Sequence, residues 1–126
     1  MKVDETVRES LISALREHVR RFSKKMNDMI DKMHEAKTVE EIMRIKRDML
    51  KEWVREMPTK VEDCYFCVLY DFATDNVEGC GDCPYGKHHG ICTERGSDYD
   101  RILNLRDELI RAIHELYYSG EEYEPF

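Results

Sequence analysis

The sequence contains no glutamine, three asparagines and three prolines, whereas lysine, arginine and glutamate are abundant. Few labile amides and many charged side chains are typical of proteins from hyperthermophiles, in which networks of ion pairs contribute more to stability. No apolar run approaches the length of about 18 residues that a membrane span needs, and no charged-then-apolar signal segment opens the chain. We therefore expect a cytoplasmic protein that does not enter a membrane.

Familiar catalytic motifs are also missing. The sequence has no H-E-x-x-H zinc-protease motif, no G-x-x-x-x-G-K-[ST] phosphate-binding loop and no G-x-S-x-G nucleophile turn. Zinc deaminases place a proline before the first cysteine of a C-x-x-C pair, whereas here Pro84 follows the second cysteine. These absences weigh against an enzyme, and no motif identifies a small-molecule substrate.

The charge of the chain limits its partners. Its formal net charge is -7, which opposes indiscriminate binding to nucleic acids or anionic membranes. The chain has 126 residues, of which 41% are hydrophobic, enough for one domain with one core over residues 1–126. Residues 121–126, which are acidic and aromatic, are expected to form a flexible tail.

Three long segments show the apolar periodicity of helices. The first runs from about Thr6 to Ala36 and starts at a predicted capping box of Thr6 and Glu9. The second starts at Thr38, with Glu41 completing another capping box, and ends before Pro58; the third runs from Ser97 to Gly120. The apolar side chains expected to face inward from the second and third segments are Val39, Ile42, Met43, Met49, Leu50, Trp53, Val54, Met57, Tyr99, Ile102, Leu103, Leu109, Ile110, Ile113, Leu116 and Tyr117.

These segments predict an all-α fold. The first two should form an antiparallel helical hairpin, because very few residues separate them. A short helix over Val61–Phe72 and the long C-terminal helix complete the bundle. The glycine-rich stretch between these last two cannot build a core of its own, so something else must order it.

All five cysteines lie in that part of the chain, between residues 64 and 92. Two C-x2-C pairs are separated by twelve residues, and a fifth cysteine follows after eight more. Such spacing is typical of tetrahedral Zn²⁺ sites, because two intervening residues let both thiolates reach one ion. Four of the following five residues are therefore the predicted zinc ligands, with Cys92 the least certain: Cys64, Cys67, Cys80, Cys83 and Cys92.

Other states of these cysteines stay open. An iron–sulfur cluster is the main alternative, because Cys-Pro ends some cluster motifs and five thiols exceed what zinc needs. Disulfides or free thiols are a further alternative, although an odd count leaves one cysteine over. His88 and His89 are additional candidate ligands, but adjacent histidines in a glycine-flanked loop are more often solvated.

The same stretch resembles a group of small uncharacterised phage and archaeal proteins. The shared pattern is C-x2-C, a gap, C-x2-C-P and a lone cysteine, and it covers about the middle quarter of the chain. The matching positions are Cys64, Cys67, Cys80, Cys83, Pro84 and Cys92. The resemblance implies a metal-binding cysteine cluster and no particular activity.

Two further features concern partners. One basic stretch in the first helix could bind phosphate groups, or else be a solvated face paired with acidic neighbours: Arg16, Arg20, Arg21, Lys24 and Lys25. In addition, the first helix would be roughly 46 Å long and the second roughly 28 Å, at about 1.5 Å per residue. Because the longer helix stays apolar beyond the shorter one, we expect a homodimer joined through the first helix.

We therefore expect a small helical protein with a structural zinc site that acts as a non-catalytic protein-binding module. A zinc protein that binds nucleic acid through the basic stretch and the loop from Lys87 to Arg95 is one alternative. An iron–sulfur redox or sensor protein is the other.

Overall fold

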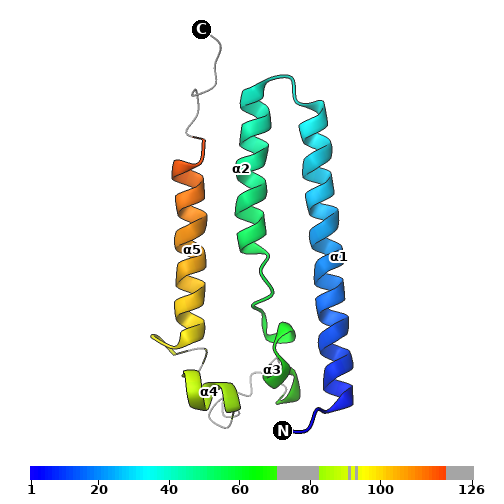
Figure 1. Ribbon diagram of the computed structural model, residues 1–126, viewed down its shortest axis with the longest axis vertical. Helices are drawn as coiled ribbons and strands as arrows, with labels where there is room; N and C mark the ends of the chain where they lie inside the picture. Colours follow the sequence, from blue (N-terminus) through cyan, green and yellow to red (C-terminus); the bar gives the residue numbers. More distant parts are fainter. Residues whose placement is uncertain (71–82, 91, 93, 119–126) are drawn as a thin grey trace. The chain divides into compact units, whose positions relative to one another are not determined.

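The computed structural model describes residues 1–70, 83–90, 92 and 94–118. These residues are mostly helical, and no strand occurs among them. The helices, in chain order, are α1 (Glu5–Glu35), α2 (Val39–Arg55), the short 3-10 helix η1 (Val61–Asp63), α3 (Tyr65–Leu69), α4 (Pro84–His89) and α5 (Asp98–Leu116) (Figure 1). Within this part of the chain, the prediction of an all-α fold with a long C-terminal helix is confirmed. None of the helices described is long and apolar enough to cross a membrane.

The chain forms two compact units, and each contains a part of α1 and a part of α5. The cysteine unit consists of Met1–Val19 and Pro58–Asn104, and the hairpin unit consists of Arg20–Met57 and Leu105–Phe126. The predicted flexible tail, residues 121–126, lies outside the residues that the structure describes.

The start of α1 differs from the prediction. The Asp4 carboxylate accepts a hydrogen bond from the backbone N–H of Val7 at 3.1 Å, and the helix begins at Glu5. Thr6 is therefore already inside the helix, and the predicted capping box of Thr6 and Glu9 is wrong. Asp4, two residues before Thr6, is the N-cap residue because its carboxylate reaches the free backbone N–H groups of the first turn.

The caps of α2 and α5 agree with the sequence. The Thr38 hydroxyl accepts a hydrogen bond from the Glu41 N–H at 3.1 Å, and α2 ends at Arg55, before Pro58. The Ser97 hydroxyl accepts from the Asp100 N–H at 3.1 Å, so Ser97 caps α5. That helix ends at Leu116 rather than near Gly120, and Tyr118 adopts a left-handed backbone with φ 53°.

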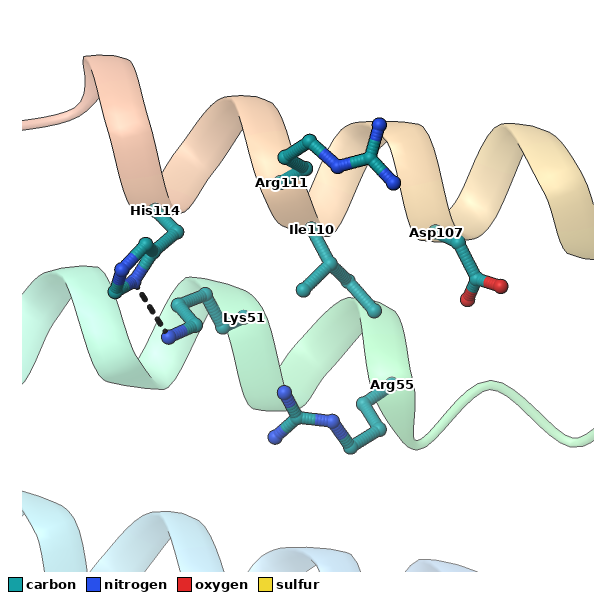
Figure 2. Close-up of a pocket in the computed structure, with 6 residues that line it drawn as sticks. All are labelled: Lys51, Arg55, Asp107, Ile110, Arg111 and His114. Carbon is teal, nitrogen blue, oxygen red and sulfur yellow. Dashed lines mark hydrogen bonds between the residues drawn. The ribbon is translucent and has the colours of Figure 1, made fainter.

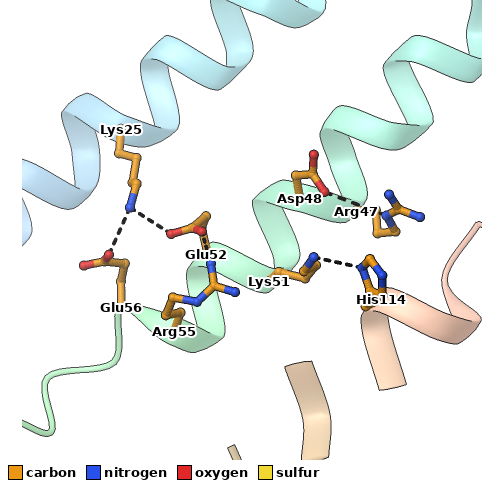
Figure 3. Close-up of polar contacts among 8 residues, drawn as sticks. All are labelled: Lys25, Arg47, Asp48, Lys51, Glu52, Arg55, Glu56 and His114. Carbon is orange, nitrogen blue, oxygen red and sulfur yellow. Dashed lines mark hydrogen bonds and ion pairs between the residues drawn. The ribbon is translucent and has the colours of Figure 1, made fainter. Parts of the chain in front are cut away.

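In the hairpin unit, polar contacts join α2 to both of its neighbours. Towards α5, the Lys51 ammonium donates to Nδ1 of His114 at 2.9 Å (Figure 2). Towards α1, the Lys25 ammonium donates to the carboxylates of Glu52 at 2.8 Å and Glu56 at 3.0 Å (Figure 3). These contacts hold α2 against a helix on either side.

One aromatic cluster packs between α1 and α2 in the same unit. The Trp53 indole N–H donates to the Met26 sulfur at 2.7 Å, and Met26 is only 6% exposed. The Phe22 and Trp53 rings meet edge to face, with their centroids 6.1 Å apart. Because only residues 36–38 connect α1 to α2 and the two helices lie side by side, they run antiparallel, as a hairpin (Figure 1).

Many apolar side chains stay in contact with solvent. Within the described ranges, the buried apolar side chains are Val7, Met26, Cys83 and Tyr118. Five side chains that were expected to face inward are exposed, and that prediction is wrong for Val39, Trp53, Ile102, Leu109 and Leu116. The apolar pattern of each helix is wider than the stripe that its neighbour covers, so apolar surface remains for a partner.

In the cysteine unit, the predicted single helix over Val61–Phe72 is interrupted. Cys64 has an extended backbone, with φ -115° and ψ 124°, between η1 and α3. The Asp4 N–H donates to the Tyr65 hydroxyl at 2.8 Å, which ties the start of α1 to α3. The prediction missed this break because no glycine or proline marks it in the sequence.

Candidate metal centre

The described cysteines come from three short segments of the cysteine unit. Cys64 is the N-cap residue of α3 and Cys67 lies within that helix. Cys83 is the N-cap residue of α4 and is buried, with 6% of its surface exposed, and Cys92 follows α4. Cys64 and Cys83 each stand directly before a short helix, and neither side chain forms a hydrogen bond that caps it.

The four thiols are close enough to affect one another electrostatically. Burial raises the pKa of the Cys67 thiol to about 12, and the charge and hydrogen bond of Cys64 act in the same direction. The charges of Cys92 and Cys83 raise it further. The side chains of Cys64, Cys83 and Cys92 are thus near enough to Cys67 for their charges to act on its thiol.

A tight backbone contact positions the segment that carries Cys92. Gly90 ends α4 with φ 84° and ψ 154°, a conformation that is essentially restricted to glycine. A Cβ atom at this position would lie 3.1 Å from Cβ of Ser97. The Ser97 hydroxyl in turn donates to the Cys92 carbonyl at 3.4 Å. Ser97 therefore caps α5 and also fixes the chain beside Cys92.

His89 and Tyr85 lie at the edge of the cluster. Nδ1 of His89 is 2.8 Å from the Asp98 carboxylate, and its ring packs on Tyr85 with centroids 4.7 Å apart. Burial raises the pKa of the Tyr85 hydroxyl, and the charges of Cys92, Asp98 and Cys64 add to the shift. Because Asp98 occupies Nδ1, only Nε2 of His89 is left to act as a ligand. His88 is exposed.

The chemistry of the donors fits a soft ion. Thiolates select zinc or an iron–sulfur cluster over magnesium or calcium. No three His, Cys, Asp or Glu side chains of the described ranges already stand as ligands around one point. Cys80, the remaining predicted ligand, lies outside those ranges. The zinc site therefore stays a prediction.

The basic stretch predicted to bind phosphate lies along α1, on Arg16, Arg20, Arg21, Lys24 and Lys25. Lys24 forms an ion pair with Asp28 at 3.2 Å. Lys25 forms ion pairs with Glu52 and Glu56 of α2. Acidic neighbours thus offset part of the charge that the sequence alone suggests, and phosphate binding by this stretch stays a prediction.

A groove of the hairpin unit, which no sequence pattern predicted, gathers basic side chains from α2 and α5 (Figure 2). Lys51 and Arg55 lie four residues apart on α2, and Arg111 and His114 lie three apart on α5. These spacings place each pair on one helix face. The sequence therefore indicated a basic face on each of these two helices. It could not indicate that the two faces meet, because that depends on how the helices pack.

Comparisons with known proteins add no relative. No protein-family model, no curated protein and no solved structure matches the chain.

Proposed function

We propose that this protein is a non-catalytic protein-binding module whose cysteine unit is held together by a structural zinc ion. The nearness of Cys64, Cys83 and Cys92 to Cys67, together with the spacing of the two C-x2-C pairs, is the observation that carries this proposal. In the described part of the chain, no recognisable catalytic motif accompanies these thiols.

The short helices of the cysteine unit give a reason for a metal. Helices α3 and α4 have five and six residues, whereas isolated helices below about 12–15 residues are marginal in water. A structural zinc site contributes on the order of 10–16 kcal/mol, as much as the stability of a whole domain. One ion is thus sufficient to order these segments.

Elemental analysis of protein purified without oxygen tests the metal directly. We expect one zinc per chain, and a sharp loss of zinc when Cys64, Cys67, Cys80 or Cys83 is changed to serine, because a hydroxyl is a poor replacement for a thiolate. Cys92→Ser should lose less zinc, because the other four cysteines would suffice for a tetrahedral site. Iron with sulfide in place of zinc would establish the iron–sulfur alternative, and metal-free protein would overturn the proposal.

The exposed apolar surface supports a protein partner. Leu105, Leu109 and Leu116 of α5 are 55%, 51% and 77% exposed, and Ala112 lies between them. Their spacing of four, three and four residues is that of a coiled-coil seam. A self-complementary seam suits a symmetric pair of identical chains, so the proposed partner is a second copy of this protein.

Sedimentation at micromolar concentration tests this partner and locates the contact. Leu109→Glu should convert a dimer to a 15.1 kDa monomer if α5 forms the interface. The control is Val19→Glu, which changes an apolar side chain of α1 that is 60% exposed. Dissociation by Val19→Glu alone would instead establish the dimer through the first helix that the sequence predicts. A wild-type monomer would overturn self-association.

A further inference from the structure

A groove of about 420 Å³ lies between α2 and α5 in the hairpin unit. Its volume is within the range of about 300–1,000 Å³ that small-molecule sites occupy. Two positions of α2 and four of α5 line it: Lys51, Arg55, Asp107, Ile110, Arg111 and His114.

The charge of this groove is opposite to that of the whole chain. Three of its lining residues are cations and one is a carboxylate, whereas the protein has a formal net charge of -7. Cations that gather against the overall charge indicate a local preference for an anion, because charge of one sign that lines a recess concentrates its counter-ions.

Two of the three cations keep their charge available. Arg55 forms an ion pair with Glu52, and Asp107 forms one with Arg106. Within the described residues, however, Lys51 contacts no carboxylate and Arg111 forms no ion pair. These two cations stand on opposite helices that line the groove.

The contact between Lys51 and His114 fixes a third donor. A lysine ammonium can only donate, so Nδ1 of His114 accepts at 2.9 Å and the ring proton is on Nε2. His114 therefore offers an N–H group rather than a lone pair from its other nitrogen. Figure 2 shows Lys51 and Ile110 between the two helices, with His114 towards one end and Asp107 towards the other; the Arg111 side chain lies along α5, and the Arg55 side chain extends from α2 away from α5.

We propose that this groove binds the phosphate group of a small phosphorylated molecule. Arg111 supplies a guanidinium fork that matches two phosphate oxygens, and Lys51 supplies a point charge. Asp107 repels a second phosphate at its own end, which favours a ligand with one phosphate group over a polyanionic chain. Ile110 offers an apolar contact to the rest of the molecule. This site is separate from the cysteine unit and does not rest on the metal.

Calorimetric titration of the full chain with inorganic phosphate tests the site, at constant ionic strength and with chloride as the balancing anion. We expect saturable binding of one phosphate per chain. Lys51→Gln and Arg111→Gln should each weaken it about tenfold, since a charge-assisted hydrogen bond is lost. Lys46→Gln on α2 and Arg101→Gln on α5, both exposed and outside the groove, are the matched controls and should bind like the wild type. Glutamine is a good helix former, so all four variants should keep their helical circular dichroism.

Two further readouts can overturn the proposal. Phosphate should move the ring NMR signals of His114 most among the five histidines, and unmoved His114 signals at saturation would contradict the site. A short single-stranded DNA identifies the source of the phosphate. Binding to DNA alone, with a steep dependence on salt, would replace the small molecule by nucleic acid. Equal losses in groove and control variants would show attraction to any positive charge, and absence of saturable binding would reject the site.

Discussion

The hairpin unit and the cysteine unit hold their helices together by different means. In the hairpin unit, α2 has 17 residues and contacts its neighbours through ion pairs, an indole–sulfur hydrogen bond and an edge-to-face ring pair. In the cysteine unit, α3 and α4 have only five and six residues, and Cys64, Cys83 and Cys92 lie near enough to Cys67 for their charges to act on it. The hairpin unit divides its stability among many weak contacts, whereas our proposal for the cysteine unit concentrates stability in one metal site.

Removal of the metal should produce the largest effect and separate the units most clearly. A chelator that strips the ion should expose the chain after Lys87 and after Arg95, both exposed residues of the cysteine unit, to trypsin. The proposed zinc site would contribute on the order of 10–16 kcal/mol, and we expect the long helices to form without it. Most of the helical circular dichroism should therefore persist.

Limited proteolysis before and after chelation measures this difference. Cleavage after Lys46, on α2 of the hairpin unit, is the internal control and should stay slow. Equal resistance at Lys87 with and without a demonstrably removed metal would show that the cysteine unit does not depend on an ion.

The next largest effect should come from the centre of the hairpin unit. Met26→Ala removes a side chain that is 6% exposed and that accepts the Trp53 hydrogen bond. Truncation of a buried methionine costs about 2–5 kcal/mol of unfolding free energy. Because few side chains around Met26 are buried, we expect a loss near the lower end, about 2 kcal/mol. Urea denaturation followed by circular dichroism gives the value.

Met29→Ala, about one turn later and only partly buried, is the control for Met26→Ala. It should cost less than half as much. Similar losses at both positions would mean that the contact with Trp53 contributes nothing beyond ordinary burial.

In the cysteine unit, Gly90→Ala should cost about 1–3 kcal/mol, since it combines a backbone restricted to glycine with a close contact to Ser97. Gly96→Ala is a suitable control, because Gly96 has a similar φ of 87° but no atom within 4 Å of the place that a Cβ would take. The excess loss at Gly90 measures the contact that positions Cys92. If Gly96→Ala costs the same, the approach of Gly90 to Ser97 is not required.

The smallest expected effect concerns Lys25 and depends on pH. Its hydrogen bonds to Glu52 and then to Glu56 raise the pKa of Lys25 above the ordinary value of 10.5. Because the pKa is raised on folding, the contact contributes its full stabilisation below about pH 10.5. This stabilisation is lost as the pH rises through the pKa of the folded state. Because the Lys25 side chain is 46% exposed, its worth should be about 0.5–1 kcal/mol.

Lys25→Met keeps the length of the side chain and removes the charge. Its deficit in unfolding free energy should be present at pH 7 and shrink at strongly alkaline pH, as measured by urea denaturation. Lys24→Met, which removes a pair with Asp28 on the same helix, should show a smaller deficit. A deficit for Lys25→Met that is independent of pH would assign the effect to packing.

Helix type and most helix ends could be predicted from local chemistry. Thr38, Pro58 and Ser97 each act on neighbouring residues, and the structure places helix ends beside all three. The wrong cap at Thr6 has a local cause as well, since Asp4 competes with it for the same N–H groups.

Burial and the groove could not be predicted in the same way. Trp53 and Leu109 fit the apolar stripes of their helices, yet both are exposed, because exposure depends on how much of each stripe a neighbour covers. Lys51 and His114 are 63 residues apart in the sequence, so their contact follows only from the packing of α2 on α5. The cysteine spacing indicated candidate metal ligands, which stay a prediction, but it did not indicate the extended backbone at Cys64.

The division of α1 and α5 between the two units has a consequence for biosynthesis. Each unit consists of two separate stretches of chain, so neither can be produced as one continuous fragment, and a cut between Val19 and Arg20 would sever α1 itself. During synthesis, the α1–α2 hairpin can form as soon as Met57 has left the ribosome. The cysteine unit must wait for Asn104, and the hairpin unit then waits for the rest of α5. The two units are therefore expressed as one chain and complete their folding together.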